Sequence, residues 1–410
     1  MNNNLLNNFL IYVSYDTISD PTSRLHPSTA HQFELAKELI KELGDLGCAN
    51  VYLSDKCYCY AEIDANAEGY PVIGLMAHLD TSPDMSGKDV KPRIIEAYDG
   101  GDIVLNEELG VIIKASEFPN LAKRVGETII VTDGTTLLGA DDKAGIAIIM
   151  EIIKTLKEND DIKHGLVKIC FSPDEEIGEG ADNVDLERFK CDFAFTFDGD
   201  EENIINCENF NAASAFVTIN GVNIHPGSAK GKMKNSIMIA NEFDSLLSPF
   251  ARPQFTEMYE GFNHLNEISG TVEKTNMHYI IRNHDLAKFE SQKQEFQKAK
   301  TAIDNKYGEG TCNLEIKDSY FNMYNIVSTH PEIIELAKSA IRDAGMEPLL
   351  APIRGGTDGA RLTYDGIITP NIGTGGGNYH GKLEYVSLNG MEKAVKVGIN
   401  ILQNSKKGSV

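Results

Sequence analysis

Basic residues are scarce in this 410-residue sequence, which has 38 Lys and Arg against 61 Asp and Glu and a formal net charge of -23. A protein that binds nucleic acid or an anionic membrane through phosphate groups needs a basic face. The charge therefore argues against both kinds of partner and leaves cation binding open. With 41% hydrophobic and 24% charged residues, the composition is typical of a globular protein.

Cysteine pairs, a basic N-terminal segment and long apolar runs are also missing. The seven cysteines are scattered and none forms a C-x-x-C pair, which argues against a disulfide framework or a structural zinc ribbon and favours a reducing compartment. No Lys or Arg precedes Arg24, so the basic region of a signal peptide is absent. The longest apolar runs, such as 146–150, are too short to span a bilayer. These features predict a cytoplasmic protein with no membrane partner.

The first half of the chain alternates short apolar runs with amphipathic stretches. Strands are expected at 71–77, 167–171 and 192–197, and a helix with a broad apolar face is expected at 144–157. Strands that alternate with helices predict a mostly parallel sheet covered on both faces. The length also favours two or three domains, at about 150 residues per domain.

The pattern changes near Asn209, where the order of elements becomes β-α-β-β-α-β. This order is that of the ferredoxin-like split unit, an α+β fold. After Asn325 the alternation of strands and helices resumes, and it ends in a helix capped by Ser387. The elements expected between these points are a strand at 212–219, a helix at 232–247, strands at 268–274 and 277–282, a helix at 285–304 and a strand at 312–319.

We therefore predict an α/β protein with a second domain inserted into the first. Residues 1–208 and 323–410 form the two parts of the larger domain, which contains a mostly parallel mixed sheet. Residues 209–322 form the smaller, ferredoxin-like domain.

Acids and histidines stand just beyond several expected strand ends, where open α/β sheets place their sites. In the H-x-D motif, a step of two residues keeps His78 and Asp80 on one side of an extended chain. His78 could then bind a metal while Asp80 holds its other ring nitrogen or positions a neighbouring group. A strand end with a capping aspartate is the alternative. The full set is His78, Asp80, Asp141, Asp142, Glu175, Glu176, Asp198 and His380.

Each of the other candidates also has a plain structural alternative. Asp141 and Asp142 could cap the helix that follows, although a metal-bridging carboxylate also suits that position. The acids of FSPDEEIGEG are costly to cluster without a cation, yet they could form a solvated turn. Asp198 could be a ligand or a turn residue, and His380 lies in a glycine-rich stretch that could be a flexible loop.

Together, two histidines and at least three carboxylates at strand ends indicate a hydrolytic site with two cations. Nitrogen and oxygen ligands of this kind suit zinc, with cobalt or manganese as substitutes. The motifs H-E-x-x-H and G-x-S-x-G do not occur in the sequence, so the common zincin and serine-hydrolase interpretations lack support.

The segments around these residues resemble the peptidase T family of the di-zinc exopeptidase superfamily, over nearly the full chain. The resemblance implies a di-zinc exopeptidase-like catalytic domain, and a cytosolic metallo-aminopeptidase that releases the N-terminal residue of tripeptides. The segments that carry it are IGLMAHLDTSPDMSGK, TLLGADDKAGIA, PDEEIGEGA, ENFNAASA, NIHPGSAKGKMKNS, GTVEKTNMHYIIR, PIRGGTDGARL and NYHGKLEYVSLNGMEKAV.

The resemblance also implies a ligand set for two zinc ions per subunit. His78, Asp141 and Asp198 would hold one zinc. Asp141 would bridge to the second zinc, held by Glu176 and His380. The family often has a cis peptide after the bridging aspartate.

Further roles follow from the same resemblance. Asp80 would support the His78 site, and Glu175 would act as general base toward a zinc-bridged hydroxide. The inserted domain would form the interface of a homodimer. His225, in the NIHPGSAK segment, would then reach the partner's active site and stabilise the oxyanion.

An enzyme for short peptides with a free N-terminus must also recognise the ends of its substrate. Arg282 and Arg354 could grip a carboxylate with paired N–H donors, or each could simply pair with a nearby acid. Asn235 is a weaker candidate for a polar contact.

Two other functions remain open on the sequence alone. A related di-zinc amidohydrolase or dipeptidase, acting on N-acyl amino acids or dipeptides, would use the same metals. A non-catalytic metal-dependent binding protein would be favoured if Glu175 or a ligand were missing, and none is.

Overall fold

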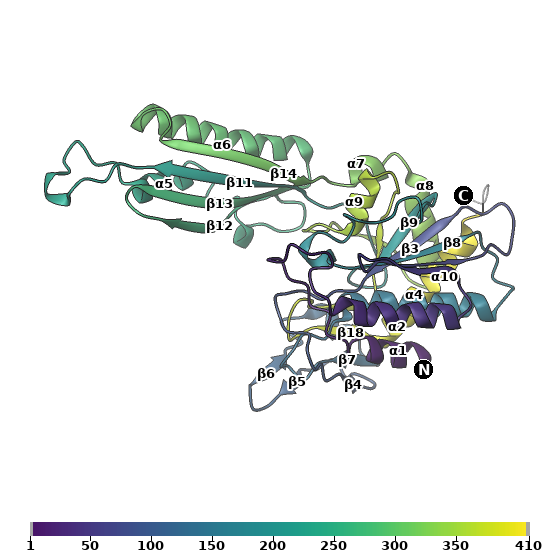
Figure 1. Cartoon of the computed structure of the whole chain (residues 1–410). Coiled ribbons are helices and arrows are strands. Elements are labelled where there is room, and N and C mark those ends of the chain that lie inside the picture. The colour runs from purple at the N-terminus through teal and green to yellow at the C-terminus, as the bar shows by residue number, and fades with distance from the viewer. Residues whose placement is uncertain (1–2, 407–410) are drawn as a thin grey trace. The chain divides into compact units, whose positions relative to one another are not determined.

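The computed structural model describes residues 3–406, which divide into two compact units (Figure 1). Unit 1 contains the described residues up to Cys207, residues 325–351 and the described residues from Thr357 onward. Unit 2 contains Glu208–Tyr324 and the short segment Pro352–Gly356.

An eight-stranded mixed sheet forms the centre of unit 1, in the order β1-β2-β8-β3-β9-β16-β10-β15. The four neighbouring strands β8, β3, β9 and β16 run parallel, and the pairs β1–β2, β2–β8 and β16–β10 are antiparallel. The α/β fold with a mostly parallel mixed sheet is thus confirmed. The strands are β1 (Ala49–Leu53), β2 (Cys59–Ile63), β3 (Ile73–His78), β8 (Val167–Ser172), β9 (Phe193–Phe197), β10 (Ile204–Asn206), β15 (Leu349–Leu350) and β16 (Asn371–Ile372).

Burial on both faces explains why the central strands are easy to recognise from sequence. Every residue of β3 is buried, as expected for a parallel strand in the middle of a covered sheet. The strand starts at Ile73, two residues after the expected Pro71, and ends on His78. The strands expected at 167–171 and 192–197 are present within one residue at each end.

Helices cover this sheet. α4 packs on β3 and β9, α10 packs on α4 and α8, and α2 packs on β1 and β2. α4 begins at Ala140, four residues before the expected start, although Asp141 and Asp142 have non-helical backbone angles. Ser387 caps α10 through Gly390 N, as expected. The helices are α1 (Asn3–Tyr12), α2 (Gln32–Asp45), α3 (Pro119–Ala122), α4 (Ala140–Glu158), α7 (Tyr324–Val327), α8 (Pro331–Asp343), α9 (Asp358–Tyr364) and α10 (Leu388–Asn404).

Two small antiparallel sheets in unit 1 were not expected, because their short strands leave little periodic pattern. One has the order β17-β18-β7-β4, and its hairpin β17–β18 carries the loop that contains His380. The other pairs β5 with β6. The strands are β4 (Arg93–Ile95), β5 (Ile103–Asn106), β6 (Val111–Ile113), β7 (Ile129–Val131), β17 (Gly376–Gly377) and β18 (Tyr385–Ser387).

Unit 2 has the ferredoxin-like fold that its pattern predicts. Its four strands are antiparallel in the order β12-β13-β11-β14. The strand expected at 268–274 lies earlier, at Phe262–Gly270, because Lys274 already begins the next strand. The elements are β11 (Asn211–Asn220), α5 (Ser236–Ser245), β12 (Phe262–Gly270), β13 (Lys274–Asn283), α6 (Leu286–Tyr307) and β14 (Cys312–Tyr320).

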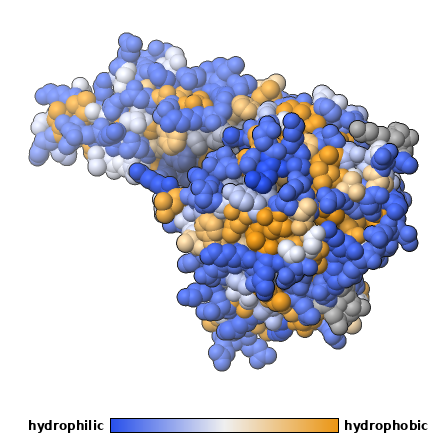
Figure 2. All heavy atoms as spheres, turned by 45° about the vertical axis from the view of Figure 1, so that its right-hand side comes forward, coloured by the Kyte–Doolittle hydropathy of each residue, from blue (hydrophilic) through white to orange (hydrophobic). Residues whose placement is uncertain are grey.

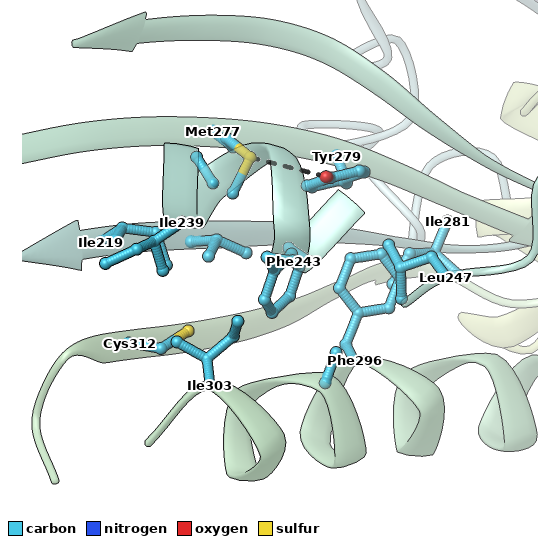
Figure 3. Packing of buried hydrophobic residues seen from close by; sticks show 14 of the residues in the cluster. Ile219, Ile239, Phe243, Leu247, Met277, Tyr279, Ile281, Phe296, Ile303 and Cys312 are labelled. Atoms are coloured by element: carbon cyan, nitrogen blue, oxygen red, sulfur yellow. Dashed lines mark hydrogen bonds between the residues drawn. The ribbon is translucent and has the colours of Figure 1, made fainter. Parts of the chain in front are cut away.

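The core of unit 2 lies between one face of this sheet and both helices (Figure 3). Phe243 of α5 and Phe296 of α6 meet Tyr279 of β13, and all three side chains are fully buried. Alternate residues of β11 point into this core, which explains its alternating pattern.

The surface shown in Figure 2 is mostly hydrophilic, with hydrophobic side chains in separate patches. Across residues 3–406, every helix is too short or too polar to cross a bilayer.

Candidate metal centre

The acids and histidines of unit 1 meet where the parallel strands end. His78 is the last residue of β3, and Asp198 directly follows β9. Glu175 and Glu176 lie in a short 3-10 turn, three residues after the end of β8. Because β8, β3 and β9 are adjacent and parallel, their carboxyl ends share one edge of the sheet.

Asp141 lies between two histidines. Its Oδ1 is 2.9 Å from His78 Nε2, which is also 4.0 Å from Asp198 Oδ1. Its Oδ2 is 3.1 Å from His380 Nε2, which is 2.8 Å from Glu176 Oε2. The two oxygens of one carboxylate thus face two different ligand sets, which is the arrangement of a bridging ligand.

These residues fit a pair of divalent cations. Ligand atoms of His78, Asp141 and Glu176 all lie within 4.8 Å of one another, and so do those of His78, Glu175 and Asp198. Glu176 Oε1 is buried without a hydrogen-bond partner among residues 3–406. A buried carboxylate oxygen without a partner is costly, and a cation would satisfy it.

Burial and the neighbouring charges shift the pKa values of these groups. Burial and the charge of Asp141 raise the pKa of Glu176 to about 8 and that of Asp198 to about 7. Hydrogen bonds to Asp141 and Glu176 raise the pKa of His380 to about 11. Burial would lower the pKa of His78, but hydrogen bonds to two aspartates raise it overall. Protons therefore offset the clustered negative charge, and a divalent cation would do the same.

Asp80 supports the site in two ways. Its Oδ1 lies 3.3 Å from His78 Nδ1, the ring nitrogen that faces away from Asp141. Its two carboxylate oxygens also accept hydrogen bonds from the backbone N–H groups of Glu175, at 2.9 Å, and Glu176, at 3.1 Å. Asp80 thus joins the end of β3 to the turn after β8.

The two neighbouring acids at the start of α4 have separate roles. Asp142 accepts hydrogen bonds from the backbone N–H groups of His78, at 3.2 Å, and Gly145, at 3.1 Å. Asp142 therefore caps the helix, while Asp141 faces the histidines. The peptide bond between the two aspartates is cis, as the resemblance implies.

Asp174 belongs to the same acidic run as Glu175, but its carboxylate binds residues that precede α2 and lie at its start. It adopts a left-handed backbone conformation, with φ 59°. Its carboxylate accepts hydrogen bonds from Ser28 N, Ser28 Oγ and Gln32 Nε2, at 2.7, 2.5 and 2.6 Å. Asp174 therefore anchors the turn that presents Glu175, a role that the sequence did not reveal.

Asp358 is a further buried acid that sequence reasoning missed. Its Oδ2 accepts a hydrogen bond of 2.8 Å from Ser172 Oγ, at the end of β8. Burial raises the pKa of Asp358 to about 7. The pKa of Glu175 is raised by burial and by the charges of Asp198 and then Asp358.

The other four predicted site residues lie in unit 2. His225 is exposed, and its Nδ1 accepts a hydrogen bond of 3.2 Å from Gly227 N. Asn235 caps α5, because its side-chain oxygen accepts from Ile237 N at 3.0 Å.

Both predicted arginines donate to backbone carbonyls. Arg282 Nη1 donates to Ala213 O at 3.2 Å and to Ile281 O at 3.0 Å. Arg354 Nη1 donates to Met258 O at 2.6 Å and to a second carbonyl of the 256–260 loop, while its Nη2 donates to Thr256 Oγ1. Both arginines therefore bind backbone carbonyls, whereas the alternative expected from sequence was an ion pair with a nearby acid. The bonds of Arg354 tie it to the 256–260 loop.

A comparison with protein families identifies the class of enzyme. The model of peptidase family M20/M25/M40 matches residues 133–404, about two thirds of the chain. The chain belongs to this family. It is a peptidase, and the predicted fold class and hydrolytic activity are confirmed.

Individual relatives show which members of this family the chain is similar to in sequence and structure. The chain is 53% identical to "Peptidase T" of Caldanaerobacter subterraneus subsp. tengcongensis over 98% of both chains. Aminopeptidase PepT from Bacillus cereus matches 98% of both chains with a TM-score of 0.78 and 24% identity. The Bacillus subtilis YXEP protein, described as a dinuclear metal binding peptidase from the M20 family, matches 98% of both chains with a TM-score of 0.65 and 16% identity. The resemblance to the peptidase T family is thus confirmed.

Proposed function

We propose that this chain is a cytoplasmic aminopeptidase that uses two divalent cations to release the N-terminal residue of tripeptides. The observation that carries the proposal is Asp141, whose two carboxylate oxygens face His78 and His380. Relatives named peptidase T over nearly the whole chain support the substrate class. Seven free cysteines support the reducing compartment.

The residues at this edge of the sheet would hold the two cations. His78, Asp141 and Asp198 would bind the first, and Asp141, Glu176 and His380 the second. We propose zinc, with cobalt or manganese as substitutes, because the donors are imidazole nitrogens and carboxylate oxygens. When bound, the cations would lower the pKa of a shared water and so make a nucleophile available at neutral pH.

Glu175 is suited to move the proton in this reaction. Its carboxylate lies within 4.8 Å of the ligand atoms of His78 and Asp198, and we do not include it among the ligands of either cation. It would accept a proton from the attacking nucleophile and deliver it to the departing amine. Its raised pKa, caused by burial and by Asp198, favours keeping that proton between the two steps.

Binding of the second cation is expected to release protons. His380, with a pKa of about 11, and Glu176, with a pKa of about 8, hold protons near neutral pH, and both must lose them to bind metal. Proton release should decrease, and apparent affinity should increase, as the pH rises through about 8. Calorimetric titration with zinc in buffers of different ionisation enthalpy measures this release. A heat that does not depend on the buffer would contradict the assignment.

In a homodimer, His225 of one subunit would stabilise the oxyanion in the other. Because its Nδ1 accepts a hydrogen bond, the neutral ring carries its proton on Nε2 and can donate it. His225→Ala should therefore lower kcat by about 10²–10³-fold with unchanged metal content. Full activity in this variant would remove His225 from the reaction.

We propose that side chains of unit 2 recognise the ends of the peptide substrate. Arg282, Arg354 and Asn235 would supply hydrogen-bond donors to the peptide. For Arg354, a peptide carboxylate would have to replace the carbonyls of the 256–260 loop as acceptor.

Substrate trials distinguish the remaining alternatives. An aminopeptidase for tripeptides should cleave Ala-Ala-Ala and leave its N-acetylated form intact, because the free amine is required. Faster cleavage of dipeptides or N-acyl amino acids would favour the related dipeptidase or amidohydrolase. A non-catalytic binding protein is not supported, because the chain belongs to a peptidase family and retains Glu175.

A further inference from the structure

Glu384 is a buried carboxylate at the end of the β17–β18 loop. Its side chain is 1% exposed. It accepts hydrogen bonds from three backbone N–H groups: those of Leu138 at 2.6 Å, Gly139 at 2.9 Å and Asp141 at 3.1 Å. These groups belong to the turn that leads into α4 and carries the bridging aspartate.

These bonds are the direct contacts that stabilise the Glu384 charge. Across residues 3–406 no Lys, Arg or His lies within ion-pair distance of Glu384, although buried Lys143 interacts with it electrostatically at longer range. A buried charge without a close partner is expensive. Charge-assisted bonds to several N–H groups can offset this cost. Gly139, with φ 81°, has the left-handed backbone conformation that glycine adopts readily.

The loop that carries Glu384 also carries His380, so it contacts the Asp141 turn twice. Glu384 Oε1 accepts a hydrogen bond from the backbone N–H of Asp141. Four residues earlier in the chain, His380 Nε2 lies 3.1 Å from Asp141 Oδ2. The two contacts fix both the backbone and the side chain of Asp141 relative to His380.

We propose that Glu384 is a positioning residue for the second cation. It holds the Asp141 turn against the His380 loop, so that Asp141 Oδ2 and His380 Nε2 converge on one ion. The first cation depends less on this contact, because His78 and Asp198 are placed by β3 and β9. This inference rests on the proposed two-cation site.

A carboxylate is required for this role because all three partners are donors. Both oxygens of Glu384 accept hydrogen bonds, whereas a glutamine would turn its NH₂ group toward at least one backbone N–H. Glu384→Gln changes the charge and one acceptor without changing the size of the side chain. Glu384→Asp keeps the carboxylate, but its side chain is one methylene shorter and so moves the charge away from the three backbone N–H groups.

The test is a titration of the metal-free protein with zinc in competition with a chromophoric chelator. Wild-type protein should bind two ions. Glu384→Gln should weaken binding of the second ion by about 10–100-fold and change the first by less than about 3-fold. In a cobalt titration of this variant, the visible absorption assigned to the second ion should appear at correspondingly higher cobalt concentration, while that of the first ion is unchanged.

Glu42→Gln is the matched control. Glu42 accepts hydrogen bonds from Asn8 Nδ2 and Tyr12 Oη in the same unit, and neither contact involves the proposed ligands. This variant should lower the thermal midpoint while both ions bind as in wild type.

Four results would decide against the role of Glu384 or against the two-cation site itself. Wild-type affinity for both ions in Glu384→Gln, or equal weakening of both, would overturn the positioning role. If that variant does not fold, unchanged titration of Glu384→Asp would overturn it instead. Fewer than two ions in the wild-type protein would contradict the proposed function, independently of Glu384.

Discussion

Replacement of Asp141 by alanine is expected to abolish binding of both cations and to reduce kcat/KM by about 10⁴-fold or more. Among residues 3–406, only Asp141 lies within ion-pair distance of both His78 and His380, so its loss would leave each proposed ligand set incomplete. When bound, the proposed cations would supply both the nucleophile and several kcal/mol of charge stabilisation. Metal content by mass spectrometry and turnover of a tripeptide measure the two effects.

A suitable control for Asp141→Ala is Glu187→Ala, which removes an exposed acid of the same unit. That variant should retain two cations and normal turnover. Retention of two cations with normal turnover by Asp141→Ala would exclude the bridging role.

The second large effect is expected for Glu175→Gln. Both cations should remain bound, because the assigned ligands are untouched, while kcat should fall by about 10²–10⁴-fold. A glutamine has the size of the glutamate but cannot accept and return a proton. Turnover combined with metal analysis of the same sample separates this loss from a loss of metal.

Glu179→Gln makes the same chemical change four residues further along the chain, on a side chain that is 49% exposed. This control should have wild-type activity. Wild-type turnover in Glu175→Gln would show that another group carries the proton.

The parts of the fold that sequence predicts well are those with a long, regular hydrophobic pattern. β3 is a continuous apolar run because both its faces are covered, and β11 alternates because one face is open. By contrast, β17 and β18 have two and three residues. β17 pairs with β18, and β18 pairs in turn with β7, which no local pattern reveals.

The same distinction applies to the site. His78 and Asp198 stand at or just after strand ends, so the sheet brings them together and sequence predicts them. Glu384 and Asp174 act through backbone and side-chain partners more than 140 residues away in sequence. Such contacts depend on the tertiary arrangement of loops, which local sequence does not encode in a readable form.

The contacts of Arg354 were also difficult to predict from sequence. An arginine beside glycines in PIRGGTDG suggests a carboxylate grip, and the guanidinium group has the donors for it. In the structure those donors bind the 256–260 loop. The conformation of a loop almost one hundred residues away therefore decides what the arginine contacts.

Anomalous diffraction at the zinc absorption edge, from crystals of the zinc-loaded protein, tests the two-cation centre most directly. We expect two peaks about 3.5–4 Å apart, one beside His78 and Asp198 and the other beside Glu176 and His380, with Asp141 between them. A single peak, or peaks that do not flank the Asp141 carboxylate, would contradict the two-cation site.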